Sequence, residues 1–262
     1  PALAKSKTKA QGIFCMNNTK QLMLSTHLYT GDFDERFWPN PDDGNTTIGY
    51  NWCPGQAGSG GGQEFNSEIL DDPTRSLLVP FGANRNLFHC PADKRKGKYQ
   101  GTDVSKKGTT VPNARSVAAS QAVGTNPSKG GKVPVEGPWL TGSWGANSAA
   151  NGPFRVYGKT SDMIDPTPAN LWVIADEDEY SINDGGLAVV GPKTPFNYTM
   201  IDWPATYHNR AAGIAFADGH SEIHQWKDYR TKVYKGNVRI SNQKDSKDLI
   251  WLSERTSALI AK

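Results

Sequence analysis

An acidic run late in the chain is the densest set of metal-binding side chains. Four consecutive acids, residues 176–179, follow the apolar segment 171–175, and an Asn-Asp pair follows at 183–184. Ca²⁺ takes about six to eight oxygen ligands from carboxylates, amides and backbone carbonyls. The spacing is not that of an EF-hand, and acidic runs are commonly no more than solvated loops. The sequence therefore predicts either a solvated acidic loop or a Ca²⁺ site built from Asp176, Glu177, Asp178, Asn183 and Asp184.

A second group combines histidine with carboxylate. Nine residues separate His208 from Asp218, and two further histidines follow at 220 and 224 in a segment that reads as a strand. Imidazole with carboxylate suits zinc or another transition metal, so one interpretation is a joint site of Asp176, Glu177, His208 and Asp218. The other is that His208 hydrogen-bonds Asp218 across a hairpin and fixes its turn. The segment His-Ser-Glu-Ile-His is not H-E-x-x-H, so it does not indicate a metalloprotease.

The chain has three cysteines, Cys15, Cys53 and Cys90. They form no C-x-x-C pair, which argues against a zinc ribbon. An odd count permits one disulfide and one free thiol, and sequence alone does not decide which residues pair.

The sequence lacks the motifs of several classes of enzyme and binding protein. There is no G-x-S-x-G elbow, no P-loop and no G-x-G-x-x-G turn, so we expect no catalytic residues and no enzyme activity. A net charge of +3 is too mild for a nucleic-acid partner. No run of about 18 apolar residues is present to span a membrane. Because the chain opens with Pro-Ala-Leu-Ala and no Met, we expect that a preceding segment has been removed.

The first 32 residues read as one long helix that ends at Gly31-Asp32. One stripe along it, at Leu3, Ala10, Phe14, Gln21, Leu22 and Tyr29, is expected to pack the second half of the helix on the rest of the chain. Its first half is rich in lysine, and four lysines, at 5, 7, 9 and 20, precede the first acid, Asp32. These form either a solvated face or a contact surface for anionic lipid or neighbouring subunits.

The remainder, residues 33–262, reads as a globular head. Apolar segments at 117–123, 171–175 and 213–217 are expected strands, and Asp218-Gly219 followed by 220–226 indicates a hairpin. Residues 92–137 are rich in Lys, Gly, Ser and Thr and are expected to be long loops, and Asp245 and Ser246 can cap a final helix. The fold class is therefore α+β, a long N-terminal helix packed on an antiparallel sheet with large loop insertions.

Tryptophan is abundant and leaves two interpretations open. Trp38, Trp52, Trp139 and Trp144 lie among Gly, Pro and Asn, where loops are expected. Exposed aromatic faces in such loops would suit a glycan partner. Aromatic side chains more often plug loops onto a core, which is the alternative.

Five segments, in order along nearly the whole chain, resemble one bacterial family. The His208–Gly219 pattern is an H-x9-D-G signature. Around it stand Pro1-Ala2-Leu3-Ala4-Lys5, a Cys-x-Asn-Asn-x-Lys-Gln-Leu motif at 15–22, a Cys-Pro-x-Asp loop at 90–93, and the segments 181–185 and 218–224. Together these resemble the prepilin-type processing-associated H-x9-D-G proteins, which are similar to type IV pilins and type II secretion pseudopilins.

The resemblance implies a pilin-like fold and a non-catalytic structural subunit of a surface or secretion filament. Its partners would be other pilin-like subunits, and a membrane reached through an apolar N-terminal segment absent from this sequence. Its location would be the periplasm or the cell surface. The family motifs that contain Cys15 and Cys90 favour a disulfide between these two, with Cys53–Cys90 as the alternative. Calcium in a late loop of related pseudopilins favours Ca²⁺ at the acidic run. The alternative function is a membrane-tethered module that binds a glycan or another ligand.

Overall fold

The computed structural model describes residues 2–40, 51–142, 152–192, 199–232 and 245–260. It begins with the helix α1, Ala2–Asp32, as the sequence predicts. This segment contains no proline and only two glycines, Gly12 and Gly31, so nothing interrupts the backbone hydrogen bonds before the end. We call the part of the chain after α1 the body.

A five-stranded sheet forms the centre of the body, in the order β5-β3-β4-β6-β7. Its strands are β3 (Val117–Ser120), β4 (Trp172–Asp176), β5 (Gly186–Leu187), β6 (Ala211–Phe216) and β7 (Ser221–Gln225). The expected strands and the hairpin at Asp218-Gly219 are therefore confirmed. The sheet is mixed and not fully antiparallel, because β5 pairs with β3 in parallel.

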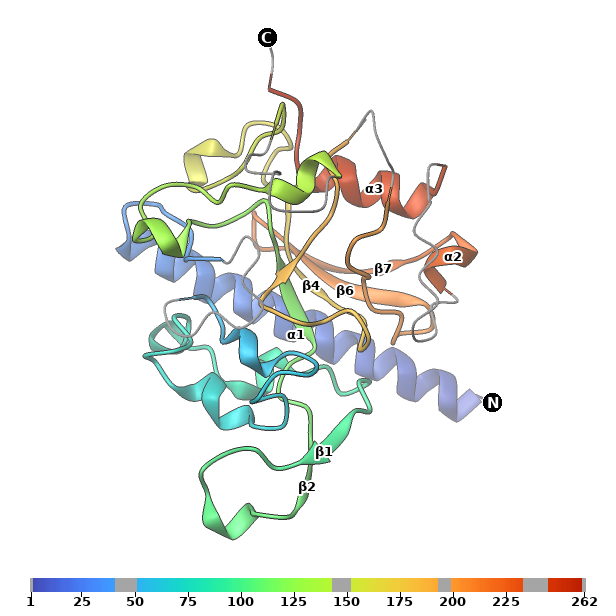
Figure 1. Cartoon of the computed structure of the whole chain (residues 1–262). Helices are drawn as coiled ribbons and strands as arrows, with labels where there is room; N and C mark the ends of the chain where they lie inside the picture. Colours follow the sequence, from blue (N-terminus) through green and yellow to red (C-terminus); the bar gives the residue numbers. More distant parts are fainter. Residues whose placement is uncertain (1, 41–50, 143–151, 193–198, 233–244, 261–262) are drawn as a thin grey trace.

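Helices cover both faces of this sheet (Figure 1). Leu22 and Met23 of α1 share one buried cluster with Val173 and Ala215. On the other face α3, Lys247–Thr256, packs Leu249 and Leu252 in a second cluster that contains Trp172, Ile214 and Phe216. Burial on both faces explains why every residue of β4 and β6 is buried.

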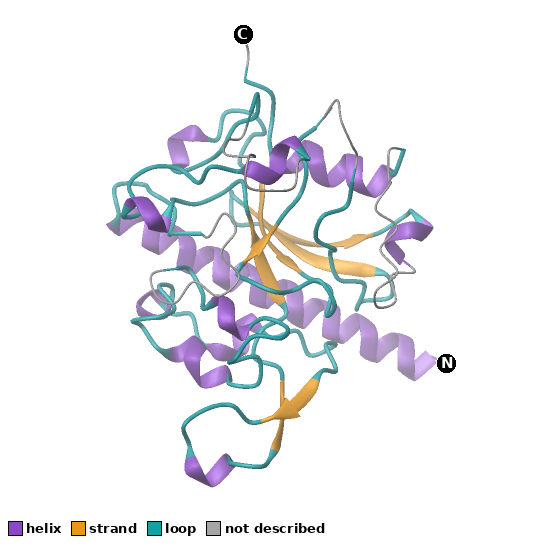
Figure 2. Ribbon diagram, viewed as in Figure 1, coloured by secondary structure: helices purple, strands orange, loops and turns teal. Residues whose placement is uncertain are grey.

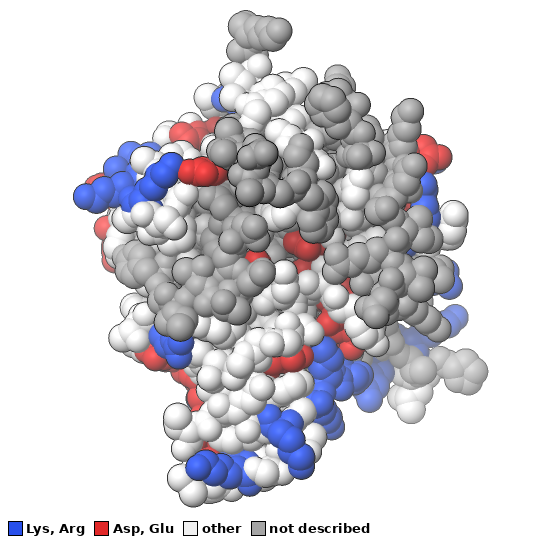
Figure 3. Space-filling model, viewed as in Figure 1, with Lys and Arg blue, Asp and Glu red and all other residues white. Residues whose placement is uncertain are grey.

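Loops and short helices make up most of the remaining body (Figure 2). A small hairpin, β1 (Lys96–Lys98) with β2 (Thr110–Pro112), extends from the segment expected to be loop. Lys and Arg gather at this end of the molecule in the face shown in Figure 3. The short helices are α2 (Tyr229–Lys232) and the 3-10 turns η1 (Gly55–Ala57), η2 (Ser67–Asp71), η3 (Val79–Phe81), η4 (Arg85–Phe88), η5 (Val104–Lys106), η6 (Pro127–Lys129), η7 (Pro138–Thr141) and η8 (Thr160–Asp162).

The final helix begins as predicted, because the Ser246 hydroxyl accepts a hydrogen bond from the amide of Leu249. The stripe expected on α1 is only half correct. Leu22 and Tyr29 are buried, whereas Leu3 and Phe14 are exposed. The lysines of α1 are exposed, as a solvated face requires. Among the described residues, no helix is long and apolar enough to cross a membrane.

Candidate metal centre

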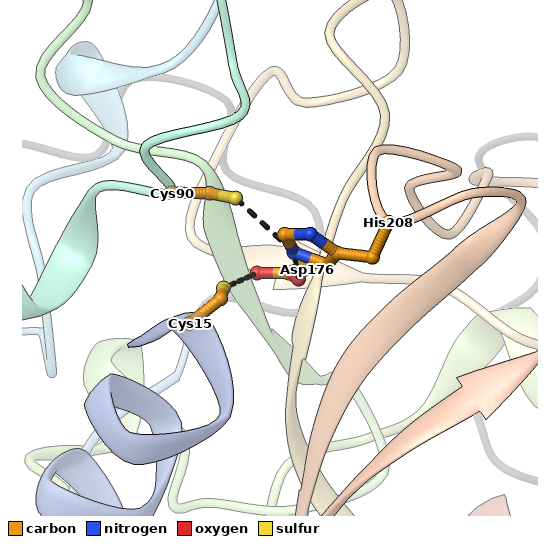
Figure 4. Close-up of side chains that lie close together, drawn as sticks. All are labelled: Cys15, Cys90, Asp176 and His208. Carbon is orange, nitrogen blue, oxygen red and sulfur yellow. Dashed lines mark hydrogen bonds and ion pairs between the residues drawn. The ribbon is translucent and has the colours of Figure 1, made fainter. Parts of the chain in front are cut away.

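Four side chains from distant parts of the chain point toward one another beside α1 (Figure 4). Cys15 lies midway along α1, Cys90 in the loop after η4, Asp176 at the end of β4 and His208 in the loop before β6. One donor atom from each lies within 4.8 Å of the donors of the other three. All four residues are buried.

Direct contacts link the four side chains. The Cys15 thiol donates to Asp176 Oδ1 at 2.7 Å. His208 Nε2 lies 3.3 Å from Asp176 Oδ2 and 3.4 Å from Cys90 Sγ. The backbone amide of Gly213 donates to Asp176 Oδ2 at 2.8 Å, which orients the carboxylate from outside the group.

A β-bulge turns Asp176 toward α1. Side chains alternate between the two faces of a strand, and Trp172 packs on the α3 face. Strict alternation would place Ile174 and Asp176 on that face as well. The register shifts between Trp172 and Ile174, however, and Ile174 packs on the α1 face. The extra residue reverses the alternation, so Asp176 faces Cys15.

The nine residues between His208 and Asp218 contain the strand β6, which sets the distance between these two positions. His208 precedes β6 and packs its ring against Gly12 of α1. Gly219 follows β6 in the turn to β7, with φ +94, a conformation that favours glycine. There it lies against His27, whose Nε2 contacts the carbonyl of Ala217 at 2.9 Å. The strand thus connects two points of contact with α1.

The four side chains shift one another's pKa values. Burial lowers the pKa of His208, but hydrogen bonds with Asp176 and Cys90 outweigh it and raise the pKa to about 9. The neighbouring Cys90 raises the pKa of the Cys15 thiol well above its ordinary value, helped by burial and by Asp176. The neighbouring Cys15 lowers the pKa of Cys90, against the effect of burial.

This donor set has a definite chemical preference. Two sulfurs, one imidazole nitrogen and one carboxylate oxygen match the ligands of zinc and similar transition metals. Calcium prefers about six to eight oxygens, and only Asp176 supplies oxygen here. Four protein donors also complete a tetrahedral sphere, which is typical of structural sites and not of catalytic ones.

The rest of the acidic run does not gather around one point. Asp178 Oδ1 accepts the amide of Tyr180, and Asp184 Oδ1 accepts the amide of Gly186. The Asn183 side chain accepts the amide of Asp184. The run is not a solvated loop either, because residues 176–178 and Asp184 are buried. Within the described ranges, the only group of three or more His, Cys, Asp or Glu donors with this proximity is the one around Asp176.

Glu177 is fully buried, and the neighbouring Ser181 side chain only weakly favours its charged form. Burial raises its pKa well above the ordinary value, and the nearby Asp202 adds to the effect. The neutral form is therefore favoured, and Glu177 stands apart from the Cys15 cluster.

Asp218 lies away from His208, so neither sequence interpretation of this pair is correct. Asp218 accepts the backbone amide of His220 and contacts its ring nitrogen Nδ1 at 2.6 Å, on the exposed turn. His224 contacts Glu222 at 3.2 Å. His208 and Asp176 do meet, as the joint-site interpretation expected, but with two cysteines in place of Glu177 and Asp218.

All three cysteines are free thiols in the structure. The expected Cys15–Cys90 disulfide is therefore absent from it, although the two residues do lie in one cluster. Cys53 lies elsewhere, next to Gly185, and burial raises the pKa of its thiol to about 12. Cys53 is thus no partner for Cys90.

The loop tryptophans plug the core. Trp38 and Trp52 are fully buried and stack on each other with centroids 5.4 Å apart. Trp139 packs against the α3-side cluster, and Trp144 lies outside the described residues. Burial of Trp38 and Trp52 confirms the plugging interpretation for these two and leaves their faces unavailable to a glycan.

Comparisons of the chain with protein-family models, with curated proteins and with solved structures find no match.

Proposed function

We propose that this chain is a non-catalytic, pilin-like structural subunit that assembles with copies of itself through α1. The observation that carries the proposal is an apolar stripe on the outward face of α1. Leu3, Phe14, Leu24 and Leu28 are 84%, 53%, 59% and 52% exposed. Exposed apolar side chains that share one helix face are typical of a protein interface.

The spacing of the stripe favours a second helix as its partner. Exposed residues recur at positions 3, 7, 10, 14, 17, 21, 24 and 28, which alternate steps of three and four as in a coiled-coil seam. The stripe is about 37 Å long at 1.5 Å per residue. A second copy offers a helix with the same length and the same spacing. The stripe also contains the polar residues Lys7, Asn17 and Gln21, as expected for a helix–helix contact that is partly accessible to solvent.

The proposal includes a location and an anchor. The family resemblance implies an apolar segment before residue 1 that holds the subunit in the membrane before assembly, and a position in the periplasm or at the cell surface. The first turns of α1 extend beyond the body with exposed lysines, in the direction such a segment would continue.

The test is photo-crosslinking in the envelope of the source cells. A photoreactive residue replaces Leu24 or Leu28, and the control replaces Val104, which is 74% exposed on the body away from α1. We expect dimers and longer ladders of this chain from positions 24 and 28 and none from 104. Monomers alone at all three positions would contradict assembly through α1. N-terminal sequencing of the same material shows whether the mature chain begins about twenty apolar residues upstream.

A further inference from the structure

We propose that Cys15, Cys90, Asp176 and His208 bind one zinc ion, which fastens α1 to the body. The inference does not depend on the proposed function. It begins from the convergence of four donors, one from each of four elements, in a buried place.

Two of the separations between donor atoms match those around a tetrahedral ion, whereas the 2.7 Å contact of Cys15 Sγ with Asp176 Oδ1 would have to lengthen. Bonds of about 2.0–2.3 Å from zinc to nitrogen, oxygen and sulfur give donor-to-donor edges of about 3.3–3.8 Å. His208 Nε2 lies 3.3 Å from the carboxylate of Asp176 and 3.4 Å from the sulfur of Cys90. These two edges therefore need no rearrangement when the ion binds. The bond from the Gly213 amide holds the carboxylate as outer partners of zinc ligands do.

The charge of the cluster is compatible with a divalent ion. Two cysteines and a carboxylate can supply up to three negative charges at one buried point, and such charges are costly to bury unless they are paired or coordinate a metal. A divalent ion bound by two thiolates, one carboxylate and a neutral imidazole leaves one net negative charge. Binding releases to solvent the protons that the donor atoms hold.

One member of the cluster, His208, also lines a cavity. This cavity has a volume of about 580 Å³ and is lined as well by Lys9, Gly12 and Ile13 of α1. Nδ1 of the His208 ring is buried and has no hydrogen-bond partner in the described structure.

The position of Cys15 along α1 indicates what the ion would do. Residues before Gly12 are largely exposed, and residues from Gly12 onward alternate with a buried face. Cys15 is thus among the first residues that hold the helix on the body. The ion would join it at one point to the Cys90 loop, β4 and the loop before β6.

The first experiment measures metal content in the whole chain purified without chelator. We expect about one zinc per chain. Cys15→Ser and Cys90→Ser should each lower the content at least fivefold, while the control Cys53→Ala, a buried thiol outside the cluster, should keep it.

A second measurement uses only the wild-type chain, so it does not depend on whether a variant folds. Cobalt added to the chelator-treated wild-type chain should produce thiolate-to-cobalt absorption and the visible bands of a tetrahedral ion, and zinc should abolish both. A folded chain that binds neither metal, or that carries a Cys15–Cys90 disulfide when purified under reducing conditions, would overturn the proposal. So would equal zinc content in Cys15→Ser, Cys90→Ser and Cys53→Ala, or calcium alone.

Discussion

Gly213 determines how closely β6 approaches the carboxylate of Asp176. Its amide donates to Oδ2, and a Cβ at this position would lie 3.1 Å from the same oxygen and 3.6 Å from Cys15 Sγ. The first separation is shorter than a relaxed contact, and neither neighbour is a flexible chain end. The absence of a side chain therefore lets strand, carboxylate and thiol share one small space.

Gly213→Ala should destabilise the chain. The added methyl must displace the Asp176 carboxylate by a few tenths of an ångström, and overpacking of this kind costs about 1–3 kcal/mol. The free energy of unfolding in urea measures the effect. Gly31→Ala is the matched control, because its Cβ meets nothing within 4 Å, and it should be neutral or stabilising by up to about 1 kcal/mol. Equal stability of the two variants would show that the space around Gly213 is not restrictive.

At the scale of elements, α1 is held by polar contacts as much as by apolar ones. Asn18 Nδ2 donates to the carbonyl of Asn86 at 3.1 Å, and Trp38 Nε1 donates to Thr26 Oγ1 at 3.0 Å. Gln11 Nε2 reaches the carbonyl of Pro91 at 2.9 Å. Each buried donor needs such a partner. The buried face of α1 therefore carries polar residues among its apolar ones, and apolar spacing alone does not distinguish it from the outward face.

A titratable side chain, His224, lies where α3 packs on the sheet. The His224 ring of β7 stacks on Trp251 of α3, with centroids 3.7 Å apart. Burial lowers the pKa of His224 from its ordinary value. Glu222 and Asp248 oppose the shift, and Arg255 supports it. The folded chain thus takes up this proton less readily than the unfolded chain.

His224 should make the chain less stable in mild acid. A depressed histidine pKa means that the unfolded state binds more protons as the pH falls below about 6.5, so the free energy of unfolding decreases there. His224→Phe keeps an aromatic ring on Trp251 and removes the titration. In urea unfolding at pH 7.5 and pH 5, wild type should lose more stability than His224→Phe. An equal loss in wild type and His224→Phe would contradict the prediction.

At the scale of the molecule, a sheet covered by α1 and α3 carries two buried clusters. Leu22, Met23 and Tyr29 secure the second half of α1 in the first of them. The first half has no comparable apolar anchor, because Leu3, Ile13 and Phe14 are exposed. The proposed zinc ion would supply the anchor at the boundary between the halves.

Metal removal should therefore loosen the chain locally. After chelation, hydrogen exchange is expected to rise at least tenfold in residues 8–18 of α1 and in the loop around Cys90. Exchange in β3 and β4 should change little, because their hydrogen bonds lie at the centre of the sheet. Mass spectrometry of peptides from chelated and zinc-loaded chain measures this. Unchanged exchange in both regions would show that no ion holds α1.

Local patterns in the sequence determined the two longer helices and the four strands β3, β4, β6 and β7. The helix to Asp32, the strands around residues 172–176 and 211–216, the Asp218-Gly219 turn and the Ser246 cap all follow from propensity, period and turn chemistry within a few neighbouring residues. The same patterns identified Asp176 and His208 as candidate ligands.

Only the tertiary structure decided which residues meet. Cys15 and Asp176 are 161 residues apart, and Cys90 and His208 are 118 apart, so no local spacing marks the cluster. The bulge in β4 decides which face Asp176 occupies, and it depends on pairing with β6. Neighbouring carboxylates such as Asp178 and Asp184 bind backbone amides instead. The sequence shows which side chains can bind a metal, whereas the packing of α1 on the sheet determines which of them lie together.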